Sequence, residues 1–305
     1  MKAEQTVLIT GASTGIGLAI ARAVCRTRYR VILTARRSSL PRFGMREIRE
    51  GPSVRIRALD VTSADQREAV VEEAERDWGG IDVLIKNAGV AYRAVVEHLV
   101  EDERLAQMNV NFRSPMELIR LVLPRMREKR QGRIITVSSV GGMMAMPTMA
   151  AYSASKFALE GAHEALWYEV RPWNIRVSLV QPGFVDSDGF QKVRYTAQSG
   201  RSEHELAEPY HEHYVNMAPF IGRLMRMSPA TPDSVARVVL KTMRRRNPPL
   251  RVPATLDARV FAALRRILPR STYHWLLYNL LPNVRTWGPS ERRASSLPPD
   301  AERDA

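Results

Sequence analysis

Short runs of almost continuous apolar residues alternate along this chain with longer stretches in which apolar residues recur at helical spacing. We expect strands at 5–10, 30–35, 53–59, 81–86, 133–137, 175–180 and 250–252. We expect helices at 16–28, 64–78, 101–129, 150–171 and 233–246, with Pro124 bending or breaking the third of them. Strands without a polar face need cover on both sides, so the pattern indicates an α/β fold with a parallel sheet between two layers of helices. Right-handed crossovers then make the sheet doubly wound, and such sheets bind ligands beyond the carboxyl ends of their strands.

The turn after the first expected strand is rich in glycine. Gly11, Gly15 and Gly17 follow the pattern G-x-x-x-G-x-G. Residues without a Cβ let the backbone turn sharply and approach a pyrophosphate, whose charge is met by the N-terminus of the next helix. We therefore predict a single Rossmann-type domain of about seven strands over residues 1–255, with a dinucleotide on this turn. The predicted cofactor residues of the turn are Gly11, Ser13, Thr14, Gly15, Ile16 and Gly17.

Two adjacent arginines, Arg36 and Arg37, follow the second expected strand. In a dinucleotide site this position faces the adenosine ribose, where an acidic residue favours NAD(H) and an arginine meets the 2′-phosphate of NADP(H). We predict NADP(H) in preference to NAD(H), although one or both arginines could instead point to solvent.

The third and fourth expected strands also end in candidate cofactor residues. Asp60 and Val61 follow the third strand, and Asp60 could bind the adenine amino group or belong to the N-cap region of the next helix. The fourth strand is followed by Asn87, Ala88 and Gly89, whose small residues allow close approach of the backbone to a ligand.

Tyr152 and Lys156 are four residues apart at the start of an expected helix, so they project from one helix face. Reduction of a ketone needs a hydride and a proton for the developing alkoxide. A free tyrosine has a pKa near ~10, and a neighbouring ammonium favours the phenolate and lowers that pKa. Ser139 could hold the substrate oxygen, and Asn111, if it interrupts its helix, could hold a water that links Lys156 to solvent. The four residues together predict a Tyr-Lys-Ser-Asn catalytic site.

These motifs resemble those of the short-chain dehydrogenase/reductase superfamily over residues of about 5 to 250. The matching positions are Thr10, Gly11, Gly15, Gly17, Asp60, Asn87-Ala88-Gly89, Asn111, Ser139, Tyr152, Lys156 and Pro182-Gly183. The resemblance implies that Tyr152 is the general acid/base and that Lys156 lowers its pKa and holds the nicotinamide ribose. It also implies that Ser139 orients the substrate and Asn111 completes a proton relay. Pro182, Gly183, Val185 and Ser187 are then expected near the nicotinamide.

The resemblance extends to one branch of the superfamily. The segments 138–142 and 152–161 are similar to those of hydroxysteroid and retinol dehydrogenases, which act on bulky lipophilic alcohols with NADP(H). Lys86 stands where many members have an asparagine, a mainly structural position, so we expect little functional loss. Ser187 replaces a common threonine and keeps its hydroxyl. By the same resemblance a homodimer or homotetramer is expected.

The segment 183–227 is expected to cover a small lipophilic substrate as a lid. Its apolar residues are Met217, Phe220, Ile221, Leu224, Met225 and Met227, and Met143, Met144, Met146 and Met149 could line the same pocket. His204, His211 and His213 lack cysteine partners and a zincin motif, so we expect a solvated helix and no metal.

Residues 256–289 form an expected helical extension, and 290–305 an expected disordered tail. Apolar and aromatic residues alternate with arginines over 256–287, so this segment could lie on an anionic membrane surface or pack on the body of the protein.

The net charge of +14 is attributed mainly to solvated arginine-rich helix faces, because no nucleic-acid-binding motif accompanies it. A single cysteine, Cys25, and the absence of a signal peptide or long apolar run predict a cytoplasmic protein, with peripheral membrane contact as an option. The main alternative to an enzyme is a catalytically silent NADP-binding protein with a regulatory or membrane-associated role.

Overall fold

A seven-stranded parallel sheet forms the centre of the computed structural model, which describes residues 4–46, 48–187 and 193–288. The strand order is β3-β2-β1-β4-β6-β7-β9. The strands are β1 (Thr6–Ile9), β2 (Arg30–Ala35), β3 (Val54–Ala58), β4 (Val83–Lys86), β6 (Gly132–Val137), β7 (Ile175–Gln181) and β9 (Arg251–Pro253). All neighbouring pairs are parallel, so the predicted doubly wound α/β fold is confirmed.

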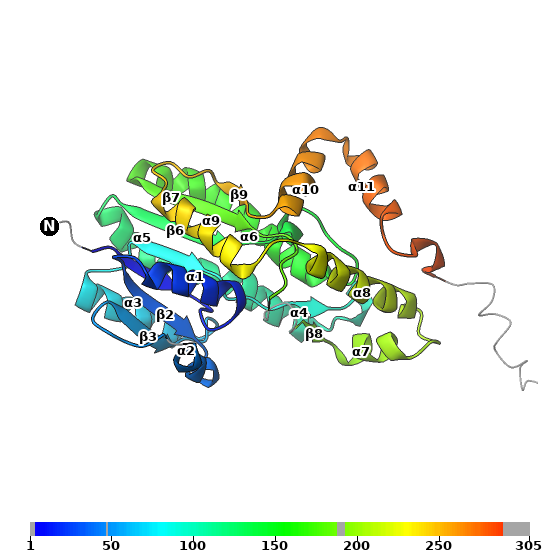
Figure 1. Cartoon of the computed structure of the whole chain (residues 1–305), viewed down its shortest axis with the longest axis horizontal. Coiled ribbons are helices and arrows are strands. Elements are labelled where there is room, and N and C mark those ends of the chain that lie inside the picture. The colour runs from blue at the N-terminus through cyan, green and yellow to red at the C-terminus, as the bar shows by residue number, and fades with distance from the viewer. Residues whose placement is uncertain (1–3, 47, 188–192, 289–305) are drawn as a thin grey trace, which may run out of the picture.

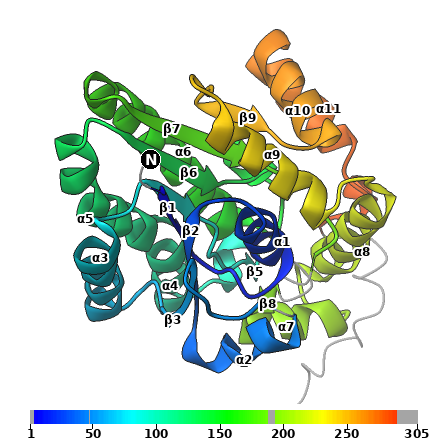
Figure 2. The same ribbon diagram turned by 60° about the vertical axis from the view of Figure 1, so that its left-hand side comes forward.

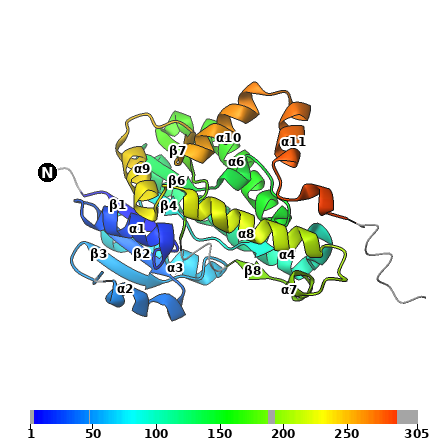
Figure 3. The same ribbon diagram turned by 45° about the vertical axis from the view of Figure 1, so that its right-hand side comes forward.

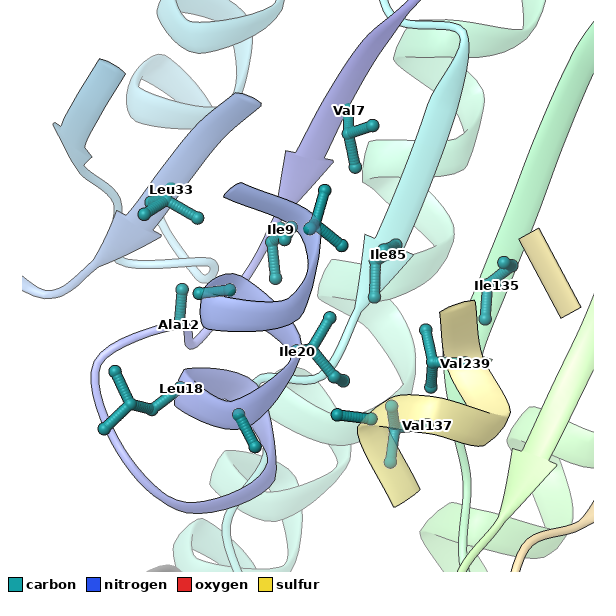
Figure 4. Packing of buried hydrophobic residues seen from close by; sticks show 14 of the residues in the cluster. Val7, Ile9, Ala12, Leu18, Ile20, Leu33, Ile85, Ile135, Val137 and Val239 are labelled. Carbon is teal, nitrogen blue, oxygen red and sulfur yellow. The ribbon is translucent and has the colours of Figure 1, made fainter. Parts of the chain in front are cut away.

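Helices cover both faces of the sheet because alternate strand residues carry apolar side chains to opposite sides. Val7 and Ile9 face α1 (Gly15–Cys25) and α9 (Pro232–Arg244), which lie side by side in Figure 2 and in the close view of Figure 4. Leu8, between them in the chain, belongs to the cluster on the other face. That face is covered by α3 (Ala64–Trp78), α5 (Ser114–Glu128) and α6 (Ala150–Val170).

The long helix expected over 101–129 is interrupted. The structure has α4 (Glu101–Met108), a π-helical turn at Asn109–Arg113, and then α5. Pro124 lies inside α5, so it does not break the helix, and a bend at this residue stays a prediction. The π-helical turn has a tertiary cause, because the Asn111 side chain is hydrogen-bonded to Val90 and Ser155, which belong to other segments.

The segments beyond the carboxyl ends of the strands form a second layer around one end of the sheet. A short parallel sheet joins β5 (Tyr92–Arg93) to β8 (Arg194–Tyr195), and α7 (Ala197–His204) and α8 (His211–Met227) follow. In Figure 1 these elements lie at the end of the molecule opposite to the N-terminus. The remaining short elements are α2 (Pro41–Met45) and the 3₁₀ turns Arg37–Ser39, Val96–His98, Val140–Gly142, Arg171–Trp173 and Val284–Thr286.

The C-terminal extension consists of two helices, α10 (Leu256–Ile267) and α11 (Arg270–Asn279). They form a hairpin that stands beside α6 and α8 in Figure 3. Their inner face packs on Val140, Met143 and Met144 through Phe261 and Tyr273. Within residues 4–46, 48–187 and 193–288, no helix is long and apolar enough to cross a membrane. The tail 290–305, expected to be disordered, lies outside the described residues.

Candidate active site

The glycine-rich turn after β1 forms a cradle that a Cβ would fill. Gly11 has a φ of +64°, and a Cβ on it would lie 2.8 Å from Cα of Ala88. A Cβ on Gly17 would overlap the carbonyl oxygen of Gly11. Gly15 also has a positive φ, 53°, and begins α1. Gly11 and Gly17 therefore let the turn pack closely on β4 and on itself, and the turn leads into the N-terminus of α1, a place suited to a pyrophosphate.

Asn87 and Thr10 hold this cradle against the end of β4. The Thr10 hydroxyl accepts hydrogen bonds from the amides of Asn87 and Ala88 at 3.1 and 3.3 Å. Nδ2 of Asn87 donates to the Gly11 carbonyl oxygen at 3.0 Å. The Asn87 side chain thus supports the turn from below, and Thr10, which the sequence motif included without a role, fixes the same junction.

At the end of β2, Arg36 and Arg37 line a surface pocket together with Asp60 and Gln66. Both arginines are exposed. Oδ1 of Asp60 accepts hydrogen bonds from the amide and hydroxyl of Thr62, at 2.9 and 2.7 Å, and these bonds and the charge of Arg36 lower the pKa of Asp60. Two guanidinium groups beside a pocket at this strand end suit a phosphate ester on a ribose. Val61 is buried next to Asp60.

Tyr152 lies in the first turn of α6 against the turn that follows β6. Ser139 caps that turn, its Oγ accepting from the amide of Gly141 at 3.0 Å, and it is also hydrogen-bonded to the Tyr152 side chain. A Cβ on Gly141 would lie 2.9 Å from Cε1 of the Tyr152 ring, so only glycine lets the ring pack this closely. Gly141 therefore positions the Tyr152 ring. This role was not predicted, although the glycine pair Gly141-Gly142 after Ser139 could have indicated it.

Lys156 is buried one helical turn after Tyr152. Its Nζ atom donates to the carbonyl oxygen of Val137 at 3.2 Å and lies 5.7 Å from the centroid of the Tyr152 ring. Burial lowers the pKa of Lys156 to about 8, against the opposing effect of Glu160. Burial also raises the pKa of Tyr152, against the effect of the Ser139 hydrogen bond. The expected lowering of the Tyr152 pKa by Lys156 is thus absent here: burial raises this pKa, and the Ser139 hydrogen bond is the contribution that opposes it.

Asn111 sits in the π-helical turn with its side chain fully engaged. Its Oδ1 accepts from the amide of Val90 at 2.9 Å, and Nδ2 donates to the Val90 carbonyl at 2.8 Å and to Oγ of Ser155 at 2.9 Å. Ser155 in turn donates to the Tyr152 carbonyl oxygen at 2.7 Å. Asn111 therefore interrupts its helix, as the sequence argument required, and it is linked through Ser155 to the turn that carries Tyr152.

A second buried lysine, Lys86, lies at the end of β4, where the sequence analysis expected a mainly structural role. Its Nζ atom is 2.8 Å from Nε2 of His163 on α6. Nε2 is also 2.8 Å from the hydroxyl of Thr136, and Nδ1 is 2.7 Å from the Leu159 carbonyl oxygen. A carbonyl only accepts, so Nδ1 carries the proton and Nε2 accepts from Lys86 and Thr136. His163 has no counterpart in the sequence-based predictions.

The segment after β7 runs along the Ser139 turn. The Pro182 carbonyl oxygen accepts from the amide of Val140 at 2.7 Å. The amide of Gly183 donates to Oγ1 of Thr255 at 2.9 Å, which joins this segment to the start of α10. Val185 is buried and Ser187 is half-buried at the edge of the described segment. Their contact with a nicotinamide stays a prediction.

An apolar region extends from the Ser139 turn to the lid and the C-terminal hairpin. Met146 and Phe261 pack against two clusters, one around Met143 and Met144 and one around Met217 and Ile221. Phe220, Leu224 and Met225 belong to the second cluster, and Met149 is also buried. Met227 is 73% exposed at the end of α8, so its assignment to the apolar lid is wrong.

The lid histidines differ from one another. His204 is exposed, as expected. His211 is buried, with Nδ1 3.0 Å from the Ser202 carbonyl oxygen, and His213 lies 4.5 Å from the ring centroid of Trp287. The expected solvated helix is therefore wrong for these two, because α8 turns this side toward α7 and the C-terminal turn.

A glycine cradle at the carboxyl edge of a doubly wound sheet, with a tyrosine and a lysine on one helix face beside it, defines a Rossmann-type oxidoreductase site. The family model described as short chain dehydrogenase matches residues 5–198. The chain belongs to the short-chain dehydrogenase/reductase family.

Two relatives illustrate the branch of the family. A 3-ketodihydrosphingosine reductase of Bacteroides thetaiotaomicron is 35% identical over 275 residues, which are 90% of this chain and 96% of the relative. Retinol dehydrogenase 8 of Bos taurus is 32% identical over 292 residues, which are 90% of this chain and 91% of the relative.

Solved structures agree with the fold. A short-chain dehydrogenase from Streptomyces avermitilis has a TM-score of 0.75 at 29% identity and covers 90% of this chain and 98% of its own. A metagenomic short-chain oxidoreductase in complex with NADP has a TM-score of 0.62 at 29% identity and covers 82% of this chain and 96% of its own.

Proposed function

We propose that this protein is an NADP(H)-dependent reductase or dehydrogenase that interconverts a ketone or aldehyde and an alcohol on a small lipophilic molecule. The observation that carries the proposal is the placement of Tyr152. Its phenol is hydrogen-bonded to Ser139 and lies one helical turn from the buried ammonium of Lys156. This group stands at the same sheet edge as the glycine cradle.

In the proposed reduction, Ser139, Tyr152 and Lys156 have different roles. The bound nicotinamide supplies the hydride in reduction and accepts it in oxidation. The Ser139 hydroxyl holds the substrate oxygen, and the Tyr152 phenol gives its proton to the oxygen as negative charge develops there. The raised pKa of Tyr152 keeps the phenol protonated and ready for this step. Lys156, protonated below about pH 8, stabilises the phenolate that remains.

Proton return to Tyr152 would pass by Lys156 and the π-helical turn. The Asn111 side chain already uses its oxygen and nitrogen on Val90 and Ser155. A relay at this residue would therefore use its main-chain carbonyl, because a π-helical turn changes the carbonyl pairing of the helix.

NADP(H) is proposed over NAD(H) on the chemistry of the β2 end. Arg36 and Arg37 supply two permanent positive charges beside the pocket that Asp60 and Gln66 complete. Asp60 already accepts from Thr62 and is attracted to Arg36, which reduces the repulsion it would exert on a phosphate. The related metagenomic oxidoreductase was solved with NADP, which supports the same choice.

A lipophilic substrate is proposed because methionines and aromatic residues gather where the turn after Ser139, α8 and the C-terminal hairpin meet. Methionine adapts to irregular apolar ligands. The clusters that meet at Met146 and Phe261 join the Ser139 turn, the lid helix α8 and the hairpin. The two relatives are named for 3-ketodihydrosphingosine and for retinol, which supports the same choice.

Peripheral contact with an anionic membrane is proposed for the outer face of α10. Leu256, Val260, Ala263 and Ile267 recur every three or four residues and are all exposed, opposite the face that packs on the body. Exposed Arg259 and Arg266 flank this stripe and suit anionic lipid headgroups. A homodimer or homotetramer remains an expectation.

The test is NADPH consumption with a panel of ketones, aldehydes, retinoids and steroids, run beside the Tyr152→Phe variant. Turnover that disappears in the variant supports the proposal. A chain that binds NADPH but turns over no carbonyl in the panel would instead favour the silent cofactor-binding alternative.

A further inference from the structure

Arg93 is a buried cation with unpartnered donor atoms. The residue is 5% exposed, and its Nε and Nη1 atoms have no hydrogen-bond partner among the residues that the structure describes. Among the described residues, no carboxylate forms an ion pair with it. Cζ of Arg93 lies 5.9 Å from the ring centroid of Tyr195, the outer limit of a cation–π interaction. An arginine keeps its charge in any environment, so this arrangement is costly for the folded chain.

The backbone around Arg93 is fixed on both sides. Both polar backbone atoms of Val90 are bonded to Asn111, at 2.9 and 2.8 Å. The amide of Val95 donates to the hydroxyl of Tyr214, a fully buried residue of the lid helix α8, at 3.0 Å. Arg93 itself pairs with Tyr195 in the short sheet of β5 and β8. The backbone on the two sides of Arg93 is therefore held by Asn111 and by α8.

This strand reaches the start of the catalytic helix. Ala94 forms a parallel bridge with Met149, and its amide donates to the Thr148 carbonyl at 2.7 Å. Met149 caps α6, whose first turn holds Tyr152. Arg93 is thus adjacent to Ala94, whose bridge to Met149 connects this strand to the first turn of α6, where Tyr152 lies.

Thr148 is a second unsatisfied group at this place. It has a φ of +63°, a strained conformation for a β-branched residue, and strain of this kind clusters at ligand sites. It is 2% exposed, and its Oγ1 has no hydrogen-bond partner. Arg93 and Thr148 therefore each precede one member of the Ala94–Met149 bridge, and each carries buried polar atoms that lack a partner among the described residues.

We propose that Arg93 binds an oxyanion carried by the substrate, a carboxylate or a phosphate, while the substrate's carbonyl lies at Tyr152. The substrate class is then a lipophilic carbonyl compound with an acidic group, which the neighbouring Thr148 hydroxyl helps to hold. This inference rests on the proposed function. It disfavours a substrate with an ammonium group near its carbonyl, since the buried guanidinium would repel it.

The test compares three ligands with the same alkyl chain: octanoate, octyl phosphate and octan-1-ol. Their dissociation constants are measured on the NADPH-loaded full chain by the shift in its melting temperature. We expect the wild type to bind at least one of the two anions more tightly than the alcohol, and the tighter anion identifies carboxylate or phosphate. In Arg93→Met we expect anion binding to weaken about 10- to 100-fold, the range of charge-assisted hydrogen bonds, with octan-1-ol unchanged.

A matched control lies on the partner strand. Arg194 is exposed in β8, so Arg194→Met removes the same charge from the same small sheet without touching the proposed site. If it weakened the anions as much as Arg93→Met, general attraction would explain the binding and the inference would be overturned. Arg93→Lys keeps the charge without the fork and should bind the anions with intermediate strength.

Stability provides an independent readout. A structural arginine would leave a less stable protein when removed, whereas a ligand-binding cation without partners would not. We expect the ligand-free melting temperature of Arg93→Met to equal or exceed that of the wild type. A wild type without preference for either anion, an Arg93→Met variant that keeps the preference, or a clear loss of melting temperature in that variant each overturns the inference.

The inference and the proposed function can fail separately. Reduction of a neutral ketone such as 2-octanone by NADPH tests only the reaction. If 2-octanone is reduced and Arg93→Met changes no anion affinity, the oxyanion site is wrong and the enzyme assignment stands.

Discussion

The Nζ atom of Lys86 lies 2.8 Å from Nε2 of His163, and both side chains are buried. Neither group has a carboxylate partner among the contacts that the structure describes. Burial lowers the pKa of Lys86 well below its usual value, and the nearby charge of Lys156 adds to the effect. The pKa of His163 is lowered for the same reasons. Burial therefore disfavours a positive charge on either member of this hydrogen-bonded pair.

Lys86→Met should change how stability depends on pH. Because the folded-state pKa of Lys86 is lowered, the unfolded chain binds an extra proton between that pKa and about 10.4, so wild-type stability rises with pH across this window. The lowered pKa of Lys156, about 8, adds a rise of stability in the same direction, so the contribution of Lys86 is the difference between the slopes of the wild type and of Lys86→Met. We expect Lys86→Met to flatten this rise, by at most about 1.4 kcal/mol per pH unit, the value for one whole proton. Urea unfolding at several pH values measures it, and the exposed Lys241→Met is the control that should keep the slope.

Tyr152→Phe should abolish turnover and leave the cofactor site intact. The variant removes only the hydroxyl, so the ring still packs on Gly141 while the proton donor is gone. We expect kcat to fall by about 10²- to 10⁴-fold, the usual contribution of a general acid, with an unchanged NADPH dissociation constant. Steady-state rates and NADPH fluorescence titration measure the two quantities. A variant that keeps its rate would show that Tyr152 is not the acid.

Arg36→Asp should shift cofactor preference toward NADH. A carboxylate at the end of β2 would repel a 2′-phosphate and accept a hydrogen bond from a free ribose hydroxyl. We expect the ratio of kcat/KM for NADPH over NADH to fall about 10- to 100-fold. Arg28→Asp makes the same change at the opposite end of β2, where Arg28 is exposed, and should leave the ratio as it is. Equal effects of the two variants would show that Arg36 does not determine the preference for NADPH over NADH.

The rate of carbonyl reduction should fall as the pH rises through about 8. Burial lowers the pKa of Lys156 to about 8, so above this pH the lysine loses the charge that stabilises the Tyr152 phenolate in the transition state. Lys156→Arg keeps its charge at all these pH values, so its lower rate should show no fall at this point. A wild-type kcat that is constant from pH 7 to 9.5 would contradict the assignment.

Local chemistry made much of this site predictable from the sequence. Gly11, Gly15 and Gly17 are fixed by the shape of one turn, and Tyr152 and Lys156 by the spacing of one helix. The parallel sheet could be predicted because strands that are apolar on both faces must be covered by helices on both sides. Features that depend on a single segment therefore appear in the sequence at the correct residues.

Features that depend on distant segments did not. Lys86 and His163 are 77 residues apart, and no sequence motif near either residue indicates that the two side chains are in contact. The π-helical turn is set by bonds from Asn111 to Val90 and Ser155, so helical periodicity predicted one long helix instead of two. Met227 is apolar like the expected lid residues. It is the last residue of α8, however, and lies beyond the part of the helix that faces the core.

The outer stripe of α10 should bring the protein to anionic membranes. Leu256 and Ile267 are 68% and 76% exposed, and Val260 lies between them on the same face. An amphipathic helix gains apolar burial at a bilayer surface, and each nearby arginine adds about 1 kcal/mol with anionic lipids. We expect the wild type to float with phosphatidylglycerol-containing vesicles and to bind less at high salt.

Two variants separate the contributions to this contact. Leu256→Ser with Val260→Ser and Ile267→Ser removes the apolar stripe, and Arg259→Glu with Arg266→Glu reverses the flanking charges. Because these side chains are exposed, both variants should keep the wild-type melting temperature and reduce 2-octanone at the wild-type rate. Both should lose vesicle binding, whereas Tyr152→Phe should bind as the wild type does. If the serine variant still floats with the vesicles, α10 is not the contact surface, and its apolar stripe must be covered by another copy of the chain or left in water.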